Sequence, residues 1–217
     1  MISKNKTKLL KEICDEVWNC TDSPLYAYRK ENNYYPVLGE GSHDAYAIFV
    51  GEAPGKNEAQ TGRPFCGRAG ALLDELLLSI SLPRENVYIT NIVKDRPPEN
   101  RDPTPEEIKF YAPFLDRQLS IIKPHVIVTL GRFSMEYIMT RYGLARRLGS
   151  IGAIHGELFI ATLPYGKVLL MPMYHPAASI YNKGTKKYLE EDFKKLKKSL
   201  DELPKSLVAW CPYFTMR

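Results

Sequence analysis

Short apolar runs alternate with segments of helical periodicity along the middle of the chain. Four of these runs are short enough to be buried strands and end at glycine, proline or polar residues. They lie in "AYAIFVGEAPG", "NVYITNIV", "HVIVTLG" and "KVLLMPMYHP". Because helical segments separate the runs, the pattern predicts a parallel sheet covered by helices on both faces.

Helices are predicted between and after these strands. Apolar residues recur at helical spacing in "GALLDELLLSI", "TPEEIKFYAPFLDRQLSII" and "GRFSMEYIMTRYG", and "KKYLEEDFKKLKKSL" is an amphipathic closing helix. Thr104, Pro105 and Glu107 have the order of an N-cap, a first-turn proline and a capping-box glutamate. We expect one domain over residues 1–200, followed by a C-terminal tail over 201–217.

Composition narrows the class of protein only moderately. The 217 residues carry a net charge of +5, which is compatible with a polyanionic partner but does not establish one. The N-terminal segment lacks the apolar core of a signal peptide and no run is long enough to span a bilayer. We therefore expect an intracellular protein, cytoplasmic or nucleoid-associated, without a membrane partner. The four cysteines form no close pair, which disfavours disulfides and metal sites.

Chemically useful residues follow each predicted strand. Ligands of open α/β sheets bind outside the carboxyl ends of the strands. In chain order, the residues found there are Gly51, Glu52, Ala53, Pro54 and Gly55, then Asn91 and Lys94, then Gly131 and Arg132, then His175 and Pro176.

These side chains suit a pocket for a nucleobase taken out of the helix stack. Asn91 offers a donor and an acceptor, which match the N3–H and O4 edge of a pyrimidine. His175 can donate to an oxygen that becomes negative, the glycine loop offers backbone N–H groups, and Phe65 can stack on a base. Each residue alone has an ordinary explanation, such as a surface ion pair for Glu52 or a turn cap for Asn91.

The segments "VGEAPGKNEAQTGRPFCGRAG", "VYITNIVK", "RPPENRDPTPEE" and "HPAASIYN" together resemble the motifs of family 4 uracil-DNA glycosylases. The resemblance covers the chain from about residue 20 to 196. It implies a three-layer α/β/α sandwich with a short, mainly parallel central sheet. It also implies a DNA repair enzyme that hydrolyses the N-glycosidic bond of deoxyuridine, releasing uracil and leaving an abasic site.

The resemblance also implies roles for single residues. Glu52 falls on the acid that orients the attacking water, and His175 on the histidine that stabilises the departing uracil anion. Phe65 and Asn91 fall on the residues that stack on and read uracil. The loop that enters the DNA minor groove falls on the segment from Ala177 to Tyr181, with Ile180 in the place of a wedge leucine. The candidates for contact with DNA in this region are Pro176, Ala177, Ala178, Ser179 and Ile180. Lys94, Gly131 and Arg132 are the further candidates for contact with DNA.

One family feature is missing from the sequence. Family 4 enzymes typically hold an iron–sulfur cluster through four cysteines, and here the four positions fall on Cys20, Ser23, Asp95 and Tyr111. We therefore expect no cluster and no other cofactor or metal. The tyrosines of "LYAYRKENNYY", together with Tyr111, are candidates for an apolar, hydrogen-bonded replacement.

The expected partner is uracil-containing DNA, single- or double-stranded, and we expect a monomer. Two alternatives remain open: a glycosylase for hypoxanthine or mismatched thymine, and a DNA-binding relative without activity. The tail "LVAWCPYF" only weakly resembles a sliding-clamp peptide, because Leu207 stands where such peptides have glutamine. We expect this tail to dock on the body of the protein.

Overall fold

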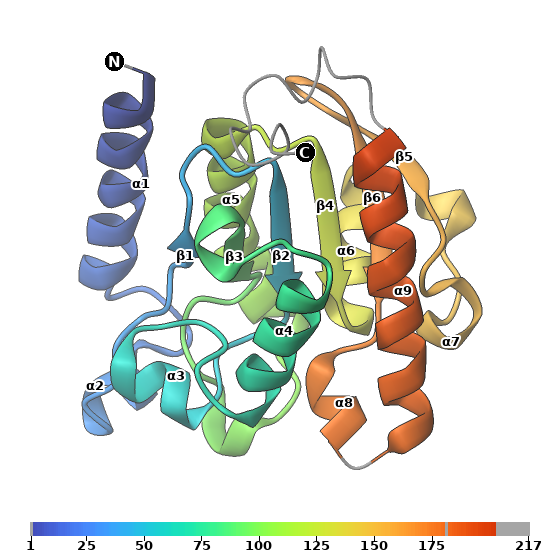
Figure 1. Ribbon diagram of the computed structural model, residues 1–217. Helices are drawn as coiled ribbons and strands as arrows, with labels where there is room; N and C mark the ends of the chain where they lie inside the picture. The colour runs from blue at the N-terminus through green and yellow to red at the C-terminus, as the bar shows by residue number, and fades with distance from the viewer. Residues whose placement is uncertain (1, 181, 203–217) are drawn as a thin grey trace.

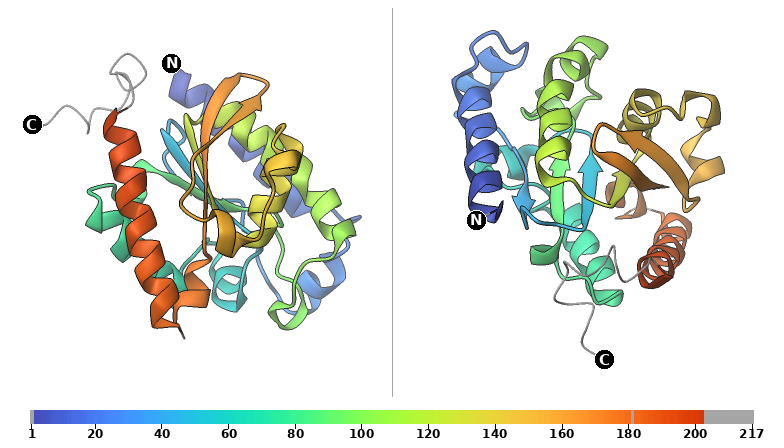
Figure 2. Two further views of the ribbon diagram at one scale, coloured as in Figure 1. Left: turned by 90° about the vertical axis from the view of Figure 1, so that its right-hand side faces the viewer. Right: turned by 90° about the horizontal axis from the view of Figure 1, so that it is seen from above.

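The computed structural model describes residues 2–180 and 182–202, and it places one six-stranded sheet between two layers of helices (Figures 1 and 2). The strand order is β1-β3-β2-β4-β6-β5. The strands are β1 (Glu40–Gly41), β2 (Ala47–Gly51), β3 (Tyr88–Asn91), β4 (Val126–Leu130), β5 (Phe159–Leu163) and β6 (Gly166–Met173). The predicted α/β sandwich is confirmed.

The four predicted strands form the parallel centre of the sheet. β3, β2, β4 and β6 pair side by side in parallel, whereas β1 and β5 add antiparallel edges that the sequence analysis did not predict. β1 has only two residues, which is too short for a periodic signal. β5 alternates between buried and exposed residues because one of its faces is open to solvent.

Two sets of helices cover the two faces of the sheet, as the view from above in Figure 2 shows. Ile48 and Val50 of β2 pack with α1, α5 and α6, while Ala47 and Phe49 point to the other face and pack with α4 and α9. This alternation explains why β2 is buried along its whole length. The covering helices are α1 (Ile2–Asn19), α4 (Arg68–Ser79), α5 (Pro105–Ile122), α6 (Arg132–Arg141) and α9 (Lys183–Glu202).

Shorter elements surround the carboxyl ends of the central strands. They are α2 (Tyr26–Glu31), α3 (Lys56–Thr61), α7 (Ile151–Ile154) and α8 (Pro176–Ile180), with 3-10 turns η1 (Arg84–Asn86), η2 (Pro98–Asn100) and η3 (Ala145–Arg147). In Figure 1 the arrows of the parallel strands point toward α3 and α8. Residues that follow different strands are therefore brought to one edge of the sheet.

The predicted start of α5 is confirmed at atomic detail. The Glu107 backbone N–H donates to Thr104 Oγ1 at 3.2 Å, and the Thr104 N–H donates to the Glu107 carboxylate at 2.9 Å. These two bonds satisfy backbone groups that the first turn of a helix leaves unpaired.

Residues 203–217, which hold nearly all of the predicted tail, lie outside the described residues. Among the helices of the described residues, none is both long and apolar enough to cross a membrane.

Candidate active site

A cavity of about 360 Å³ opens at the carboxyl edge of the sheet. Its walls come from the loop after β2, from α3 and the start of α4, from the end of β3 and from the loop after β6. The lining residues are Glu52, Ala53, Gly55, Glu58, Phe65, Ala69, Asn91, Asn100, Asp102, His175 and Ala177. Six of these were predicted as catalytic or base-binding residues, namely Glu52, Ala53, Gly55, Phe65, Asn91 and His175.

Asn91 ends β3 and points a free polar atom toward the cavity that it lines. The residue is only 2% exposed, and its side-chain oxygen Oδ1 has no hydrogen-bond partner among the described residues. A buried polar atom without a partner costs about 1–3 kcal/mol, so it marks a place where a ligand can donate. Gly51 permits this geometry, because a Cβ there would lie 2.3 Å from Asn91 Oδ1 and 2.8 Å from the Phe65 ring.

The rings of Phe65 and His175 stack at the side of the cavity. Their centroids are 5.5 Å apart with an interplanar angle of 26°. Phe65 is buried by its own loop, so little side-chain freedom would be lost when a flat base packs against it.

The hydrogen bonding of His175 fixes which ring nitrogen can act as a donor. The Ala177 N–H donates to His175 Nδ1 at 3.1 Å, so the proton of the neutral ring sits on Nε2. Burial lowers the pKa of His175 to about 4, although the charge of Glu58 opposes this shift. At neutral pH the ring is an uncharged hydrogen-bond donor, which suits it to stabilise a developing anion.

Glu52 is a carboxyl group whose ionisation falls near neutral pH. Burial raises the pKa of Glu52 to about 7, the negative charge of Asp102 adds to the rise, and the positive charge of Arg132 opposes it. Arg132 also binds Asp102 directly, with Nη2 2.5 Å from Oδ2. Glu52 therefore lies beside an ion pair at the mouth of the cavity, where its charge responds to pH.

Some of the residues predicted to contact DNA are accessible at the surface, whereas others are buried. Ala177, Ala178 and Arg132 are exposed, and Ile180 is half-buried at the end of α8, so a bound strand can reach them. Gly131 packs against His175, and a Cβ on it would lie 3.2 Å from the His175 Cβ.

Lys94 contradicts the expectation of a DNA contact, because it is fully buried. Its ammonium donates to Thr90 Oγ1 at 2.9 Å and to the Asn91 carbonyl and Gln118 Oε1 at 2.6 Å each. Burial lowers the pKa of Lys94 to about 7. Lys94 thus supports the end of β3 from within and has no face for a phosphate.

Pro176 and Ser179 face inward as well. Pro176 is buried, and the side chain of Ser179 is buried with its hydroxyl unpaired among the described residues.

Four residues of the cavity were not predicted: Glu58, Ala69, Asn100 and Asp102. Asn100 and Asp102 lie in "RPPENRDPTPEE", which resembles a family motif, but that motif does not follow a strand directly. Glu58 lies on α3, inside the glycine-rich loop. The sequence signal for a helix start at Glu58 was its position three residues after Gly55, because acidic residues are common in the first turn of a helix.

The positions of the four expected cluster cysteines do come together, but their chemistry does not fit an iron–sulfur cluster. Tyr111 Oη donates to Asp95 Oδ2 at 2.6 Å, and the hydroxyls of Ser23 and Tyr111 hydrogen-bond each other. Ser23 also donates to the same Asp95 oxygen at 3.4 Å. A cubane cluster needs four thiolates, whereas these positions supply one thiol from Cys20.

Arg29 completes this buried network and was not predicted to belong to it. Its guanidinium nitrogen Nη1 lies 3.2 Å from both Asp95 carboxylate oxygens and 3.0 Å from the Val17 carbonyl. Nη2 donates to the carbonyls of Trp18 and Cys20 at 3.0 and 3.4 Å.

Two of the expected tyrosines lie at this centre: Tyr111 hydrogen-bonds Asp95, and the Arg29 guanidinium lies over the Tyr26 ring, 5.3 Å from its centroid. Tyr28 and Tyr34 instead accept hydrogen bonds from Arg96, at 3.4 and 2.7 Å. The charged Arg29–Asp95 pair occupies the middle of the network.

Comparison with known proteins gives the family. Residues 38–197 match the model of the uracil DNA glycosylase superfamily. The chain is 45% identical to the type-4 uracil-DNA glycosylase of Saccharolobus solfataricus over 90% of this chain and 88% of that protein. It is 43% identical to the enzyme of the same name from Archaeoglobus fulgidus, over 86% and 91% of the two chains. It is 40% identical to the type-4 uracil-DNA glycosylase of Thermotoga maritima, over 88% of this chain and 95% of that protein. The chain belongs to the uracil-DNA glycosylase superfamily.

Proposed function

We propose that this protein is a uracil-DNA glycosylase that hydrolyses the bond between uracil and deoxyribose in DNA. The arrangement of Asn91, Phe65 and His175 around one cavity carries the proposal. It combines an unpartnered amide oxygen, an aromatic wall and a neutral imidazole donor in the lining of one cavity of about 360 Å³. The relatives named above are type-4 enzymes of this activity.

Uracil first leaves the helix stack and enters the cavity, at a cost of about a few kcal/mol. Its N3–H donates to the free Asn91 Oδ1, and its O4 accepts from the amide nitrogen of the same residue. One face of the base packs on Phe65. Ala177, Ala178 and Ile180 approach the strand from which the base came.

Bond cleavage then separates charge between the sugar and the base. The electron pair of the C1′–N1 bond moves to uracil, whose O2 accepts a hydrogen bond from His175 Nε2–H. The Glu52 carboxylate orients water toward C1′ and stabilises the sugar cation, together with the DNA phosphates. Water adds to C1′ and loses a proton, and uracil leaves as an anion that solvent protonates. No aspartate follows Glu52, since Ala53 stands there, so we propose water positioning rather than strong base catalysis.

A panel of modified oligonucleotides tests the reaction. We expect alkali-sensitive abasic sites in DNA with uracil, at least about tenfold faster than with a thymine mismatch or hypoxanthine, because thymine brings an additional 5-methyl group and hypoxanthine a larger ring system into the same cavity. Release of uracil from both single- and double-stranded DNA should be measured on the same strands. Faster cleavage at hypoxanthine or mismatched thymine would assign a different substrate, and binding without cleavage of any base would make the protein a DNA-binding relative.

We also propose that the protein works without an iron–sulfur cluster. The Ser23–Asp95–Tyr111 network, closed by Arg29, supports this proposal. The network lies between the end of α1, the loop that follows β3, and the helix α5. A cluster held at these positions would connect the same three elements. The four side chains are between 0% and 7% exposed, and their polar groups bind one another or nearby carbonyls.

Iron analysis of protein purified without oxygen tests this second proposal. We expect a colourless protein with no absorbance band near about 400 nm and iron far below one atom per chain. A four-cysteine relative purified in parallel serves as the positive control. Stoichiometric iron and a brown colour would refute the proposal, and the proposed glycosylase activity would be unaffected by that outcome.

DNA is the partner that this activity requires. We propose that the protein acts as a monomer in the cytoplasm or in association with the nucleoid, with binding of its tail to a sliding clamp only a weak alternative.

A further inference from the structure

Phe65 is held in a backbone conformation that its residue type rarely adopts. Its φ of +48° lies in the left-handed region, where a side chain on Cβ crowds the backbone. Such a conformation persists only where the surroundings stabilise it. The cause should therefore be found in the contacts of residues 64–67.

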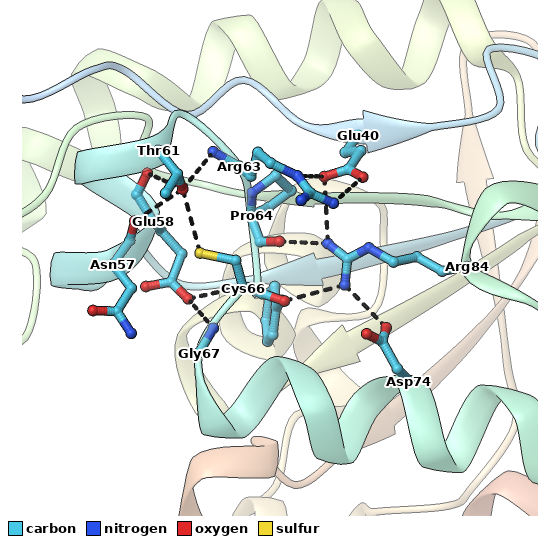
Figure 3. Close-up of polar contacts among 11 residues, drawn as sticks. Glu40, Asn57, Glu58, Thr61, Arg63, Pro64, Cys66, Gly67, Asp74 and Arg84 are labelled. Atoms are coloured by element: carbon cyan, nitrogen blue, oxygen red, sulfur yellow. Dashed lines mark hydrogen bonds and ion pairs between the residues drawn. The ribbon is translucent and has the colours of Figure 1, made fainter.

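Arg84 of η1 binds the carbonyl groups on one side of this loop (Figure 3). Its Nη1 donates to the Phe65 carbonyl at 3.1 Å, and its Nη2 donates to the Pro64 carbonyl. Asp74 holds the same guanidinium, with Oδ1 3.0 Å from Nη1, and Glu40 lies 3.7 Å from Nη2. Only 16% of the Arg84 side chain is exposed, so the guanidinium is largely shielded from water.

Glu58 binds the N–H groups on the other side of the loop. Its Oε1 accepts from the Cys66 N–H at 3.0 Å and from the Gly67 N–H at 3.2 Å. The peptide groups before and after Phe65 are thus bound by side chains of opposite charge. The helix α4 also packs tightly against this loop at Gly70. A Cβ on Gly70 would lie 1.8 Å from the Phe65 carbonyl oxygen, so the close approach requires glycine.

We propose that Arg84 is a positioning residue for uracil excision, acting through Phe65. It lies outside the cavity and touches neither the base nor the reacting atoms. Its two bonds to neighbouring carbonyls hold the Phe65 ring against His175, where the base enters. This inference rests on the proposed role of Phe65 as the wall for uracil.

A double-mutant cycle between Arg84 and Phe65 tests the proposal. We expect Arg84→Met to slow single-turnover uracil release by about 10- to 100-fold, because small displacements of a binding surface are costly in rate. In a Phe65→Ala background the same substitution should slow release by less than about threefold, since the ring that Arg84 positions is gone. A purely structural role would slow release by the same factor in both backgrounds, and that result would overturn the proposal.

Glu40→Gln is the matched control. It removes the ion pairs of Glu40 with Arg84 at 3.7 Å and with Arg63 at 2.8 Å, but leaves the bonds of Arg84 and Glu58 to the 64–67 loop. We expect its rate to stay within about threefold of the unchanged protein.

Arg84→Lys covers the case in which Arg84→Met does not fold. It keeps the charge beside Asp74, but one ammonium cannot replace the planar fork that reaches both carbonyls. A folded Arg84→Lys protein with the unchanged rate would contradict the proposal. If Phe65→Ala releases no detectable uracil, the cycle is measured with Phe65→Leu in its place. Full activity of Phe65→Ala would refute the role of Phe65 and this inference, while leaving the glycosylase activity established.

Discussion

Replacing His175 or Asn91 with alanine is expected to slow uracil release by about 10²–10³-fold while leaving DNA binding intact. In the proposed reaction, His175 supplies the neutral Nε2–H donor for the leaving group, which matters most when negative charge develops on uracil O2. Asn91 is the side chain proposed to read the pyrimidine edge. The proposal assigns neither residue to the DNA backbone, so affinity for DNA with an abasic site should change by less than about threefold.

Single-turnover rates separate these effects from substrate affinity, and each variant needs a check of its folding. Ala69 lines the same cavity without a polar side chain, and Ala69→Ser serves as a control for a small change in cavity volume. Undiminished rates in both His175→Ala and Asn91→Ala would refute the assignment of the site. A loss of DNA affinity equal to the loss of rate would instead make both residues DNA-binding groups.

The rate of uracil release is expected to rise with pH through about 7 and then level off. Burial, aided by Asp102, raises the pKa of Glu52 to about 7. In the proposed reaction, the carboxylate form is the one that orients water and stabilises the sugar cation. This form is present above the pKa and is lost below it, so the rate at one pH unit below the pKa should be about tenfold under the plateau. His175, with a pKa of about 4, stays neutral throughout this range.

Glu52→Gln should remove this pH dependence and lower the plateau rate by about 100-fold. Arg132→Met offers a second check, because loss of the positive charge that opposes the shift should move the midpoint to higher pH. A pH profile that Glu52→Gln leaves unchanged would show that another group titrates and that Glu52 has no part in it.

The parallel core of the sheet was predictable because its signals are local. An apolar run such as "HVIVTLG" needs no partner to be recognised as a strand, and the capping box of Thr104 and Glu107 lies within four residues of sequence. The rule that ligands bind at the carboxyl ends of strands then predicts that Glu52, Asn91 and His175 lie at one site, and all three line the same cavity.

Lys94 shows where such reasoning fails. Lysine is usually exposed, so its position after a strand in a protein for DNA favoured a phosphate contact. Two of its three acceptors are on β3 itself, but the third, Gln118, comes from α5, and only the packing of that helix reveals it.

Arg29 and Arg84 were missed for a similar reason. Arg29 binds Asp95, 66 residues away, and Arg84 binds Phe65, 19 residues away. Nothing in the sequence near either arginine marks it as different from a solvated one. Arg29 binds Asp95, which falls on one of the expected cluster positions, and Arg84 binds Phe65, which is proposed to stack on the base.

Uracil release should be measured side by side for the unchanged protein, Asn91→Ala and His175→Ala, because this comparison tests the proposed reaction and its site together. One uracil-containing oligonucleotide, with free uracil and alkali-sensitive sites counted in the same samples, is sufficient. We expect equal amounts of uracil and abasic sites with the unchanged protein, and rates reduced by about 10²–10³-fold in both variants. Absence of uracil release by the unchanged protein, or full release by both variants, would contradict it.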